Sequence, residues 1–340
     1  MTSFVVKVVT METLYFASDD RDFIARLEQE LKRIFKPKES IAVKLHMGEK
    51  ENPNHLKPEF VKIVVDILKK IDAKPFLFDS PVMYNSRRNT VEGYKKQCDE
   101  IGFSESVVGC PVVVSNDFIE VKGRHMKYQV CRHLAEADGV LVLTHFKGHV
   151  CSGIGGSIKN LGMGALTSKS KTDIHEGSMP RLVGECISCG KCLEVCPVKC
   201  VSYSEGKACF NLASCYGCSK CIQNCPQKCL SPSVAEFDYL LADGAAAALK
   251  TFKKSYFVNV MRNITDLCDC SSRGAKIILD DIGILMGRDI VAIDKTSLDM
   301  ANKKAGRQIF NEIWHKDSGL HIREAERLGM GNMGYVLNDD

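Results

Sequence analysis

Residues 186–197 read CISCGKCLEVCP and residues 215–226 read CYGCSKCIQNCP, and these two stretches decide the fold in the middle of the chain. Each follows the pattern C-x2-C-x2-C-x3-C-P, so the segment is an internal repeat. Three thiolates at this spacing can wrap one face of an iron–sulfur cubane. In two-cluster ferredoxins the fourth thiolate comes from the other half of the repeat. The pattern predicts a ferredoxin-like α+β domain of the bacterial type with two 4Fe–4S clusters.

Crossed ligation assigns eight cysteines to these clusters. Pairs of zinc sites are the alternative, because C-x2-C pairs also hold tetrahedral zinc. Two complete repeats that end in Cys-Pro favour iron–sulfur clusters, since the proline stops the helix and leaves loop amides free to bond the cluster sulfurs. Cluster 1 is expected to take Cys186, Cys189, Cys192 and Cys225, and cluster 2 to take Cys215, Cys218, Cys221 and Cys196.

Five further residues of the segment are surplus to the two clusters. Lys191 and Lys220 occupy matching positions in the repeat and are expected to be solvated surface lysines. Cys200 and Cys229 also match each other, and small buried thiols of this kind are expected to pack beneath a cluster. Cys209 has no partner in the repeat and receives no role.

The whole chain has 340 residues and 17 cysteines, which is long enough for about two domains. The first twenty residues contain neither a basic start before an apolar run nor a small-residue cleavage site, so we expect a cytoplasmic protein. Clustered cysteines in such a protein indicate metal binding rather than disulfides. Because exposed clusters of this type are oxygen-sensitive, an anaerobic host is expected.

The charge excludes one class of partner. The formal net charge is +4 with every cysteine counted as neutral, and each oxidised cluster with its four thiolates adds about −2, so the loaded protein is roughly neutral. No basic stripe with interleaved aromatic residues occurs, and we therefore expect no nucleic-acid partner. No run approaches about 18 apolar residues, so no membrane span is expected. The expected partner is a redox protein (a ferredoxin, a flavoprotein or an oxidoreductase), and the sequence does not fix the oligomeric state.

Strand and helix patterns alternate on both sides of the cluster segment. Such alternation predicts an α/β body with a largely parallel sheet and helices on its faces. We expect residues 1–181 to form its first part, residues 182–232 the inserted ferredoxin-like domain, and residues 233–340 its second part. The expected strands are 41–45, 75–78, 112–115, 139–144, 256–260 and 276–279, and the expected helices are 23–34, 58–71, 88–101, 130–136, 290–304, 308–315 and 320–328.

Polar residues gather in the loops after these strands. Open α/β sheets bind ligands at the carboxyl ends of their strands, so these loops are the expected location of a second site. The residues concerned are His46, Gly48 and Glu49; Asp79, Ser80, Tyr84 and Arg87; His145, Lys147 and His149; Cys268, Asp269 and Cys270; and Asp280, Asp281, Asp289 and Asp294.

Two kinds of ligand are candidates for that site. Exposed amides in the glycine-rich run 153–164 predict an anion or cofactor site at Gly155, Gly156, Lys159 and Asn160, although the run matches neither a Walker nor a Rossmann pattern. His145 and His149 together with Cys268 and Cys270 predict a mononuclear metal site, and a flavin is a further candidate. The alternatives are a chain-reversing turn, buried thiols, and aspartates that cap a helix or close a turn.

The order of these motifs resembles the DUF362 family of iron–sulfur proteins over essentially the whole chain. The motifs are VKLHMGE (43–49), FDSPVMY (78–84) with Arg87 and Arg88, HFKGH (145–149), GIGGSIKNLGMG (153–164), the two cluster repeats, CDC (268–270) and DDIGILMGRDIVAID (280–294). The resemblance implies a fold similar to the amino-terminal part of the lactate racemase group, an α/β body that holds its ligands in loops. Family members often have Ser-x-Asp-Pro where this chain has Arg288-Asp289-Ile290, which puts the role of that loop in doubt.

Two functions follow from these expectations. The first is a ferredoxin-like electron carrier whose α/β body docks a redox partner. The second is an oxidoreductase in which the clusters feed a site in the body, and a body of nearly three hundred residues is large for a carrier. The candidate catalytic residues of the second function are His46, His145, Lys147, His149, Lys159, Cys268 and Cys270.

Overall fold

The computed structural model describes residues 11–271 and 274–338. Its centre is one eight-stranded sheet with the order β18-β1-β17-β14-β7-β2-β3-β4. Neighbours from β14 to β4 run parallel, whereas β17 is antiparallel to both β14 and β1. The expected α/β class with a largely parallel sheet is therefore confirmed. The strands are β1 Glu12–Ala17, β2 Ser40–Lys44, β3 Lys74–Asp79, β4 Val112–Val114, β7 Gly139–His145, β14 Ser255–Met261, β17 Gly283–Gly287 and β18 Tyr335–Asn338.

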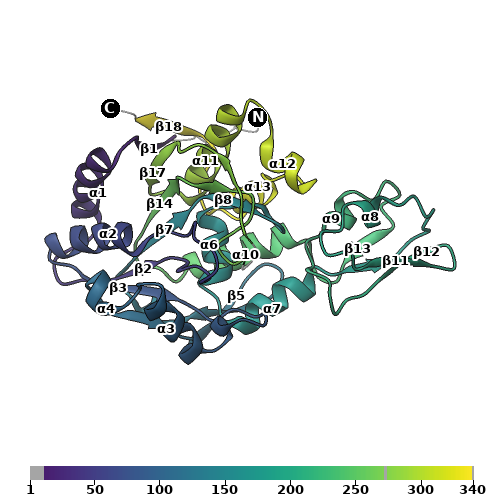
Figure 1. Cartoon of the computed structure of the whole chain (residues 1–340), viewed down its shortest axis with the longest axis horizontal. Coiled ribbons are helices and arrows are strands. Elements are labelled where there is room, and N and C mark those ends of the chain that lie inside the picture. Colours follow the sequence, from purple (N-terminus) through teal and green to yellow (C-terminus); the bar gives the residue numbers. More distant parts are fainter. Residues whose placement is uncertain (1–10, 272–273, 339–340) are drawn as a thin grey trace, which may run out of the picture.

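Helices cover both faces of this sheet (Figure 1). In β7, Leu141 and Leu143 point into the core on one face, and Val140 and Val142 point into the core on the other. Both faces of a central parallel strand must be apolar, and this explains the continuous apolar run of β7. The first face is covered by α1 Asp20–Ile34, α2 Pro58–Lys70, α3 Val91–Glu100 and α4 Glu105–Val108, and the second by α6 Ser157–Gly164, α7 Ser168–Gly177, α10 Phe237–Leu249, α11 Ile290–Ala305, α12 Ile309–Trp314 and α13 Leu320–Arg327.

Local sequence signals fix several helix ends. The side chain of Asp19 accepts a hydrogen bond from the Asp22 amide and starts α1, and Pro58 occupies the first turn of α2. Asp289 accepts from the amides of Val291 and Ala292 at the start of α11. The loop that departs from the family pattern therefore serves here as a helix cap.

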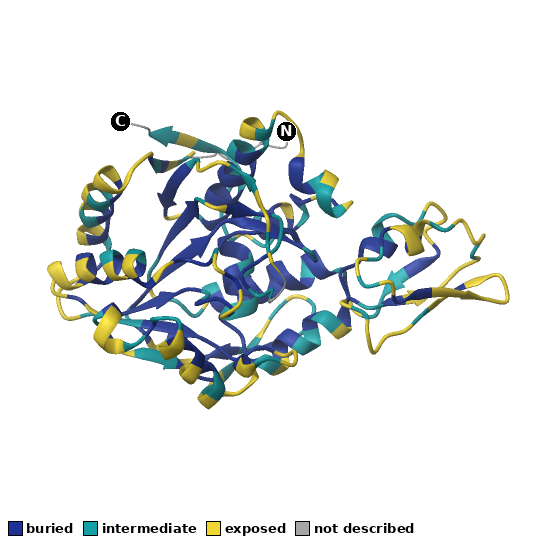
Figure 2. Ribbon diagram, in the orientation of Figure 1, coloured by how far each residue is buried: buried dark blue, intermediate teal, exposed yellow. Residues whose placement is uncertain are grey.

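The cluster segment projects from the α/β body (Figure 1). Its two ends are joined, because β10 (Pro180–Leu182) pairs with β13 (Leu230–Pro232) in an antiparallel two-stranded sheet. Between them lie α8 (Lys191–Glu194), the hairpin of β11 (Val201–Ser204) and β12 (Lys207–Phe210), and α9 (Lys220–Gln223). Figure 2 shows that the hairpin at the far tip is largely exposed, whereas the main sheet is buried.

The structure corrects two of the expected elements. Residues 127–131 are strand β6, which pairs with β5 (Phe118–Lys122), and only α5 (Arg132–Glu136) is helical. Strand β16 (Ile277–Leu279) lies outside the main sheet, because it pairs with the short strand β15 (Ile264–Thr265). The loop after β16 leads into β17, whose first residue Gly283 pairs with Met261 at the carboxyl end of β14; its Asp281 accepts a hydrogen bond from the Asn263 amide and closes a turn.

The remaining elements are short. They are the 3-10 helix η1 (Arg87–Asn89) and the hairpin strands β8 (Lys147–His149) and β9 (Gly153–Gly155). Throughout residues 11–271 and 274–338, no helix combines the length and the apolar character that crossing a bilayer requires.

Candidate functional site

A cavity of about 100 Å³ lies where the carboxyl ends of β2, β3 and β7 meet. The loops after these strands, helices α6 and α7 and the loop after β15 form its wall, which is the position expected for the second site. Its charged, histidine and cysteine residues are Lys44, Arg88, Lys147, Lys159, Lys171, Asp79, His46, His145, His149, His175, Cys268 and Cys270.

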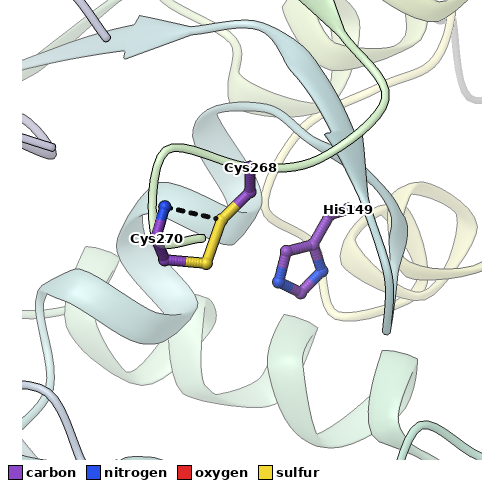
Figure 3. A group of neighbouring side chains, drawn as sticks. All are labelled: His149, Cys268 and Cys270. Atoms are coloured by element: carbon purple, nitrogen blue, oxygen red, sulfur yellow. Dashed lines mark hydrogen bonds between the residues drawn. A yellow bond between two sulfur atoms is a disulfide. The ribbon is translucent and has the colours of Figure 1, made fainter. Parts of the chain in front are cut away.

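Cys268 and Cys270 are joined by a disulfide on the wall of this cavity. Figure 3 shows the imidazole of His149 beside the two sulfur atoms. One ring nitrogen of His149 and both sulfur atoms lie within 4.8 Å of one another. Three of the four residues expected to form a metal site are therefore brought together.

The fourth residue, His145, has a different place. Its Nδ1 donates to the carboxylate of Asp269 at 2.9 Å, and its Nε2 lies 2.9 Å from the carbonyl oxygen of Arg262. Lys147 Nζ donates to the same carboxylate at 2.7 Å. His145 and Lys147 thus bind the side chain of Asp269 and fix the loop that carries Cys268 and Cys270. Because both ring nitrogens of His145 have partners, neither is left for a metal ion.

Gly148 allows this loop to approach β8. A Cβ atom added at Gly148 would lie 2.0 Å from the carbonyl oxygen of Asp266, so a larger residue would displace the chain before Cys268. Burial opposes ionisation of Asp269, but the charges of His145 and Lys147 outweigh it and hold the pKa of this carboxyl well below its usual range. Asp269 is therefore a buried anion that fixes the two cysteines on the cavity wall.

We expect the Asp269→Asn variant to lose about 3 kcal/mol of unfolding free energy, because it leaves Lys147 buried beside a neutral partner. Anaerobic urea unfolding followed by circular dichroism measures this loss. The Lys191→Met variant removes an exposed ion pair with Glu194 and should leave stability nearly unchanged. Equal losses in the two variants would contradict the anchoring role of Asp269.

Three of the five cations of the cavity have carboxylate partners and two do not. Lys44 pairs with Asp79 at 3.1 Å, Arg88 with Glu49 at 2.6 Å, and Lys147 with Asp269 at 2.7 Å. Within the described part of the chain, no carboxylate forms an ion pair with Lys159 or Lys171.

These two lysines differ in how their ammonium groups are used. Lys171 Nζ donates to Ser80 Oγ and to the carbonyl oxygens of Ser80 and Pro81, which occupies its three hydrogens. Lys159 Nζ lies 3.8 Å from Cys268 Sγ and makes no closer polar contact with a described residue. Burial, reinforced by neighbouring cations, lowers the pKa of Lys159 to about 7; burial also lowers the pKa of Lys171 to about 8.

The start of α6 does not offer free amides to an anion. The carboxylate of Asp294 accepts from the amides of Ser157 at 2.7 Å and Ile158 at 2.9 Å. A Cβ added at Gly156 would meet that carboxylate at 2.4 Å. Two amides of the glycine-rich run, those of Ser157 and Ile158, are therefore already taken by the chain's own Asp294.

The other residues of the expected cofactor site lie on the cavity wall. Gly155 and Lys159 line the cavity, whereas the side chain of Asn160 is already bonded. Its Oδ1 accepts from Lys44 Nζ at 2.8 Å, and its Nδ2 donates to Thr144 Oγ1 at 2.9 Å. Asn160 therefore positions Lys44.

The sequence patterns did not indicate four of the residues that line the cavity. Arg88, rather than Arg87, is buried beside His46 and Glu49, while Arg87 pairs with Glu100 near the surface. The duplicated arginine was the available signal, and only packing distinguishes its two members. Lys44 was hidden within an expected strand, and Lys171 and His175 lie on α7, which no pattern indicated.

Burial lowers the pKa of His46 well below its usual range, and the adjacent Arg88 adds to the effect. Its Nδ1 accepts from the Gly48 amide, and its Nε2 lies 3.2 Å from Arg88 Nη1. His46 is thus a neutral ring that holds the loop after β2 through Nδ1 and lies beside Arg88.

Two small cavities of about 20 Å³ each lie within the cluster segment. Cys200 and Cys229 are buried beside them, with sulfur atoms 3.5 Å from Cys196 Sγ and Cys225 Sγ respectively. Thiols grouped in this way can hold a metal cofactor. Four cysteines of the repeat line the first cavity, Cys186, Cys189, Cys192 and Cys225, and four line the second, Cys196, Cys215, Cys218 and Cys221.

The second of these cavities faces the α/β body. The carbonyl oxygen of Cys218 accepts from Lys316 Nζ at 3.0 Å, and the carbonyl oxygen of Tyr216 accepts from His175 Nδ1 at 2.7 Å. Lys220 is buried with its ammonium 4.7 Å from the ring centre of Trp314, so the expectation of a surface lysine is wrong there.

The first cavity lies on the far side of the segment. Cys189 on its wall is exposed. Lys191, the repeat equivalent of Lys220, is exposed and paired with Glu194, as expected. The two halves of the repeat therefore differ in environment although their sequences match.

Proteins of known sequence or structure resemble this chain to different degrees. A search of curated proteins finds no match to the chain. A crystal structure from Thermotoga maritima aligns with a TM-score of 0.49 at 10% identity over 86% of this chain and 61% of that protein. The lactate racemase apoprotein of Thermoanaerobacterium thermosaccharolyticum aligns with a TM-score of 0.39 at 13% identity over 73% of this chain and 50% of that protein. A family model described as a domain of unknown function, DUF362, matches residues 41–299. That match covers most of the chain, which therefore belongs to the DUF362 family.

Proposed function

We propose that the chain is an iron–sulfur oxidoreductase in which two 4Fe–4S clusters pass single electrons to a small anionic molecule in the cavity at the sheet edge. The observation that supports this most directly is His175, which lines the cavity and donates to Tyr216 in the cysteine loop. We place this function ahead of a simple carrier because of that contact.

The grouping of the cysteines supports the crossed ligation. Each small cavity is lined by three cysteines from one half of the repeat and a fourth from the other half. Zinc and a cubane can each take four thiolates. The spacing C-x2-C-x2-C-x3-C-P with the fourth cysteine serving the other half is the pattern of two-cluster ferredoxins, so we favour two cubanes. We accordingly propose residues 182–232 as the ferredoxin-like domain, between body segments 1–181 and 233–340.

The order of the clusters follows from their surroundings. We propose that cluster 1, with the exposed Cys189, receives electrons from a redox partner, and that cluster 2 passes them inward. Packed groups continue from the cluster 2 loop to the cavity: the ring centre of Phe237 lies 5.1 Å from that of His175 and 6.3 Å from that of His149. These buried ring contacts keep water out of the region between cluster 2 and the cavity.

The charge of the cavity supports an anionic substrate. Two ammonium groups of the cavity, those of the half-buried Lys159 and the buried Lys171, lack a carboxylate partner within the described residues, and a charge removed from water without a partner is costly. A carboxylate or phosphate group would supply the missing charge, and Lys159 has hydrogens free to donate to it. The volume of about 100 Å³ suits a small molecule.

The electron carrier is the second candidate, and the exposure of Cys189 favours it. A carrier needs only a partner surface at the tip, whereas an oxidoreductase also needs a substrate that accepts electrons. The two functions differ in what reoxidises the reduced clusters.

Rapid mixing of anaerobically reduced holoprotein with a panel of small carboxylates and phosphate esters tests the proposal. At least one anion should speed cluster reoxidation, followed by visible absorption, and Lys159→Met should abolish the acceleration. The Lys169→Met variant removes an exposed lysine of α7 and serves as the control. Reoxidation by proteins alone, with no response to any anion, would favour the carrier.

A further inference from the structure

Three potential ligands for a soft metal ion meet on the cavity wall. They are both sulfur atoms of the Cys268–Cys270 disulfide and a ring nitrogen of His149, all within 4.8 Å of one another. A disulfide is a poor metal ligand, whereas two thiolates and an imidazole form the set that catalytic zinc uses with its fourth position open. We infer that His149, Cys268 and Cys270 form a site for one thiophilic divalent ion such as Zn²⁺, closed as the disulfide and opened by its two-electron reduction.

Ser152 holds the imidazole ring of His149, the proposed nitrogen ligand of the metal ion, through its Nδ1 atom. The hydroxyl of Ser152 lies 2.8 Å from Nδ1 and also donates to the carbonyl oxygen of Ile154 at 2.6 Å. Among the described residues, Nε2 has no hydrogen-bond partner. The Ser152 amide also donates to Nδ1, at 3.1 Å, so the ring proton lies on Nε2 in the closed site. When a metal ion binds Nε2, the proton moves to Nδ1, where Ser152 Oγ replaces the amide as its partner; such support of the second nitrogen is usual for metal-binding histidines.

The remaining surroundings favour thiolates over thiols. Lys159 Nζ lies 3.8 Å from Cys268 Sγ, and the Cys270 amide donates to Cys268 Sγ at 3.2 Å. A nearby cation and an amide donor both stabilise a thiolate. Asp269 does not compete as a ligand, because its carboxylate is held by His145 and Lys147 on the other side of the loop.

The electron balance of the opening step matches the two clusters. Reduction breaks the S–S bond and converts the disulfide into two thiolates, which takes two electrons. Two reduced clusters supply one electron each and return to their oxidised states. The metal ion then binds the two thiolates directly, so no proton needs to be released. In this one respect the inference rests on the proposed function, because the electrons come from the clusters.

The metal site is tested independently of the clusters. Anaerobic holoprotein is incubated with or without a phosphine reductant, given one equivalent of Zn²⁺ and desalted. Zinc content and zinc-edge X-ray absorption are then measured, and the absorption edge distinguishes zinc from the iron of the clusters. We expect about one zinc per chain with two sulfur ligands after reduction, and less than about a tenth of that without reduction. Equal zinc in both samples, or none in the reduced sample, would overturn the inference.

Variants assign the ligands. The Cys268→Ser/Cys270→Ser and His149→Ala proteins should bind zinc at least ten-fold more weakly, whereas Cys209→Ser, which changes an exposed cysteine outside all three cavities, should bind it normally. Unchanged iron content and circular dichroism show that each variant has folded. Undiminished zinc binding in either ligand variant would assign the ion to other residues and refute the site.

The source of the electrons is tested separately by counting thiols at Cys268 and Cys270. Oxidised holoprotein is given two electrons per chain by reduced ferredoxin, alkylated and analysed by mass spectrometry. The two cysteines should become alkylated in the wild type and in Cys200→Ser, and should stay protected in Cys196→Ala/Cys200→Ser, which removes a proposed cluster 2 ligand and the thiol 3.5 Å from it that could replace it. Alkylation in both proteins would refute delivery through cluster 2, and the zinc experiment would still decide the metal site on its own.

Discussion

Alanine at Cys225 is expected to remove the cluster bound mainly by the first half of the repeat, although Cys225 belongs to the second half. In the Cys229→Ser background, Cys225→Ala should lower the iron content from about eight to about four per chain. The background is needed because Cys229 Sγ lies 3.5 Å from Cys225 Sγ and is close enough to replace it as a ligand. Cys229→Ser alone should keep both clusters.

Double variants then identify which cluster is lost. If ligation is crossed, adding Cys186→Ala to Cys225→Ala removes no further iron, because both cysteines serve cluster 1. Adding Cys215→Ala to Cys225→Ala should remove nearly all iron, because it destroys cluster 2 as well. The reverse pattern would show that each half of the repeat binds its own cluster and would refute the crossed assignment. Iron and acid-labile sulfide analysis of anaerobically purified protein provides the measurement.

Loss of Lys159 is expected to produce the second large effect, on anion binding. Among the five cations of the cavity, the half-buried Lys159 is the one whose hydrogens are not taken up by oxygen atoms of the described residues. A hydrogen bond to a charged group contributes about 1.5–3 kcal/mol, so Lys159→Met should weaken anion binding by about 10- to 150-fold. Isothermal titration calorimetry with phosphate and malonate as probes measures the change.

Two comparisons separate this effect from a general loss of charge. Lys169→Met should leave the affinity unchanged, because Lys169 is exposed and pairs with Asp173. The three ammonium hydrogens of Lys171 are already bonded, so this residue attracts an anion only through its charge. Burial lowers the pKa of Lys171 to about 8. The pKa of Lys159 is lowered to about 7. Anion affinity should therefore fall as the pH rises from about 7 to about 8, where first Lys159 and then Lys171 loses its proton. Affinity that is independent of both Lys159 and pH would contradict anion binding in this cavity.

The periodic elements of the body were predictable because their signals are local. The apolar spacing and caps of α1, α2 and α11 and the apolar runs of β2 and β7 identify themselves. Helix α10 gave no such signal, since it is rich in alanine and buried almost all round. Strand β17 was missed because antiparallel pairing at the boundary of a parallel sheet has no mark in a single sequence.

The candidate site was predictable only in part. The rule that ligands bind at the carboxyl ends of strands located the loops, and the cysteine and histidine motifs located His149, Cys268 and Cys270. The separate roles of His145 and His149 could not be predicted, because they depend on Asp269, 124 positions away from His145 in the chain. Likewise, the sequence could not show that the amides of Ser157 and Ile158 donate to Asp294 from a distant helix.

By itself the sequence determined the α/β class, the repeat of cysteine motifs and the loops that surround the cavity, because each depends on the order and spacing of neighbouring residues. Only the tertiary structure decided which half of the repeat faces the body, which cations lack a partner and which two residues are joined beside His149. These properties arise from contacts between segments far apart in the chain. Lys191 and Lys220 illustrate this difference. They occupy equivalent positions in the repeat, but Lys191 lies on the surface and Lys220 packs against Trp314.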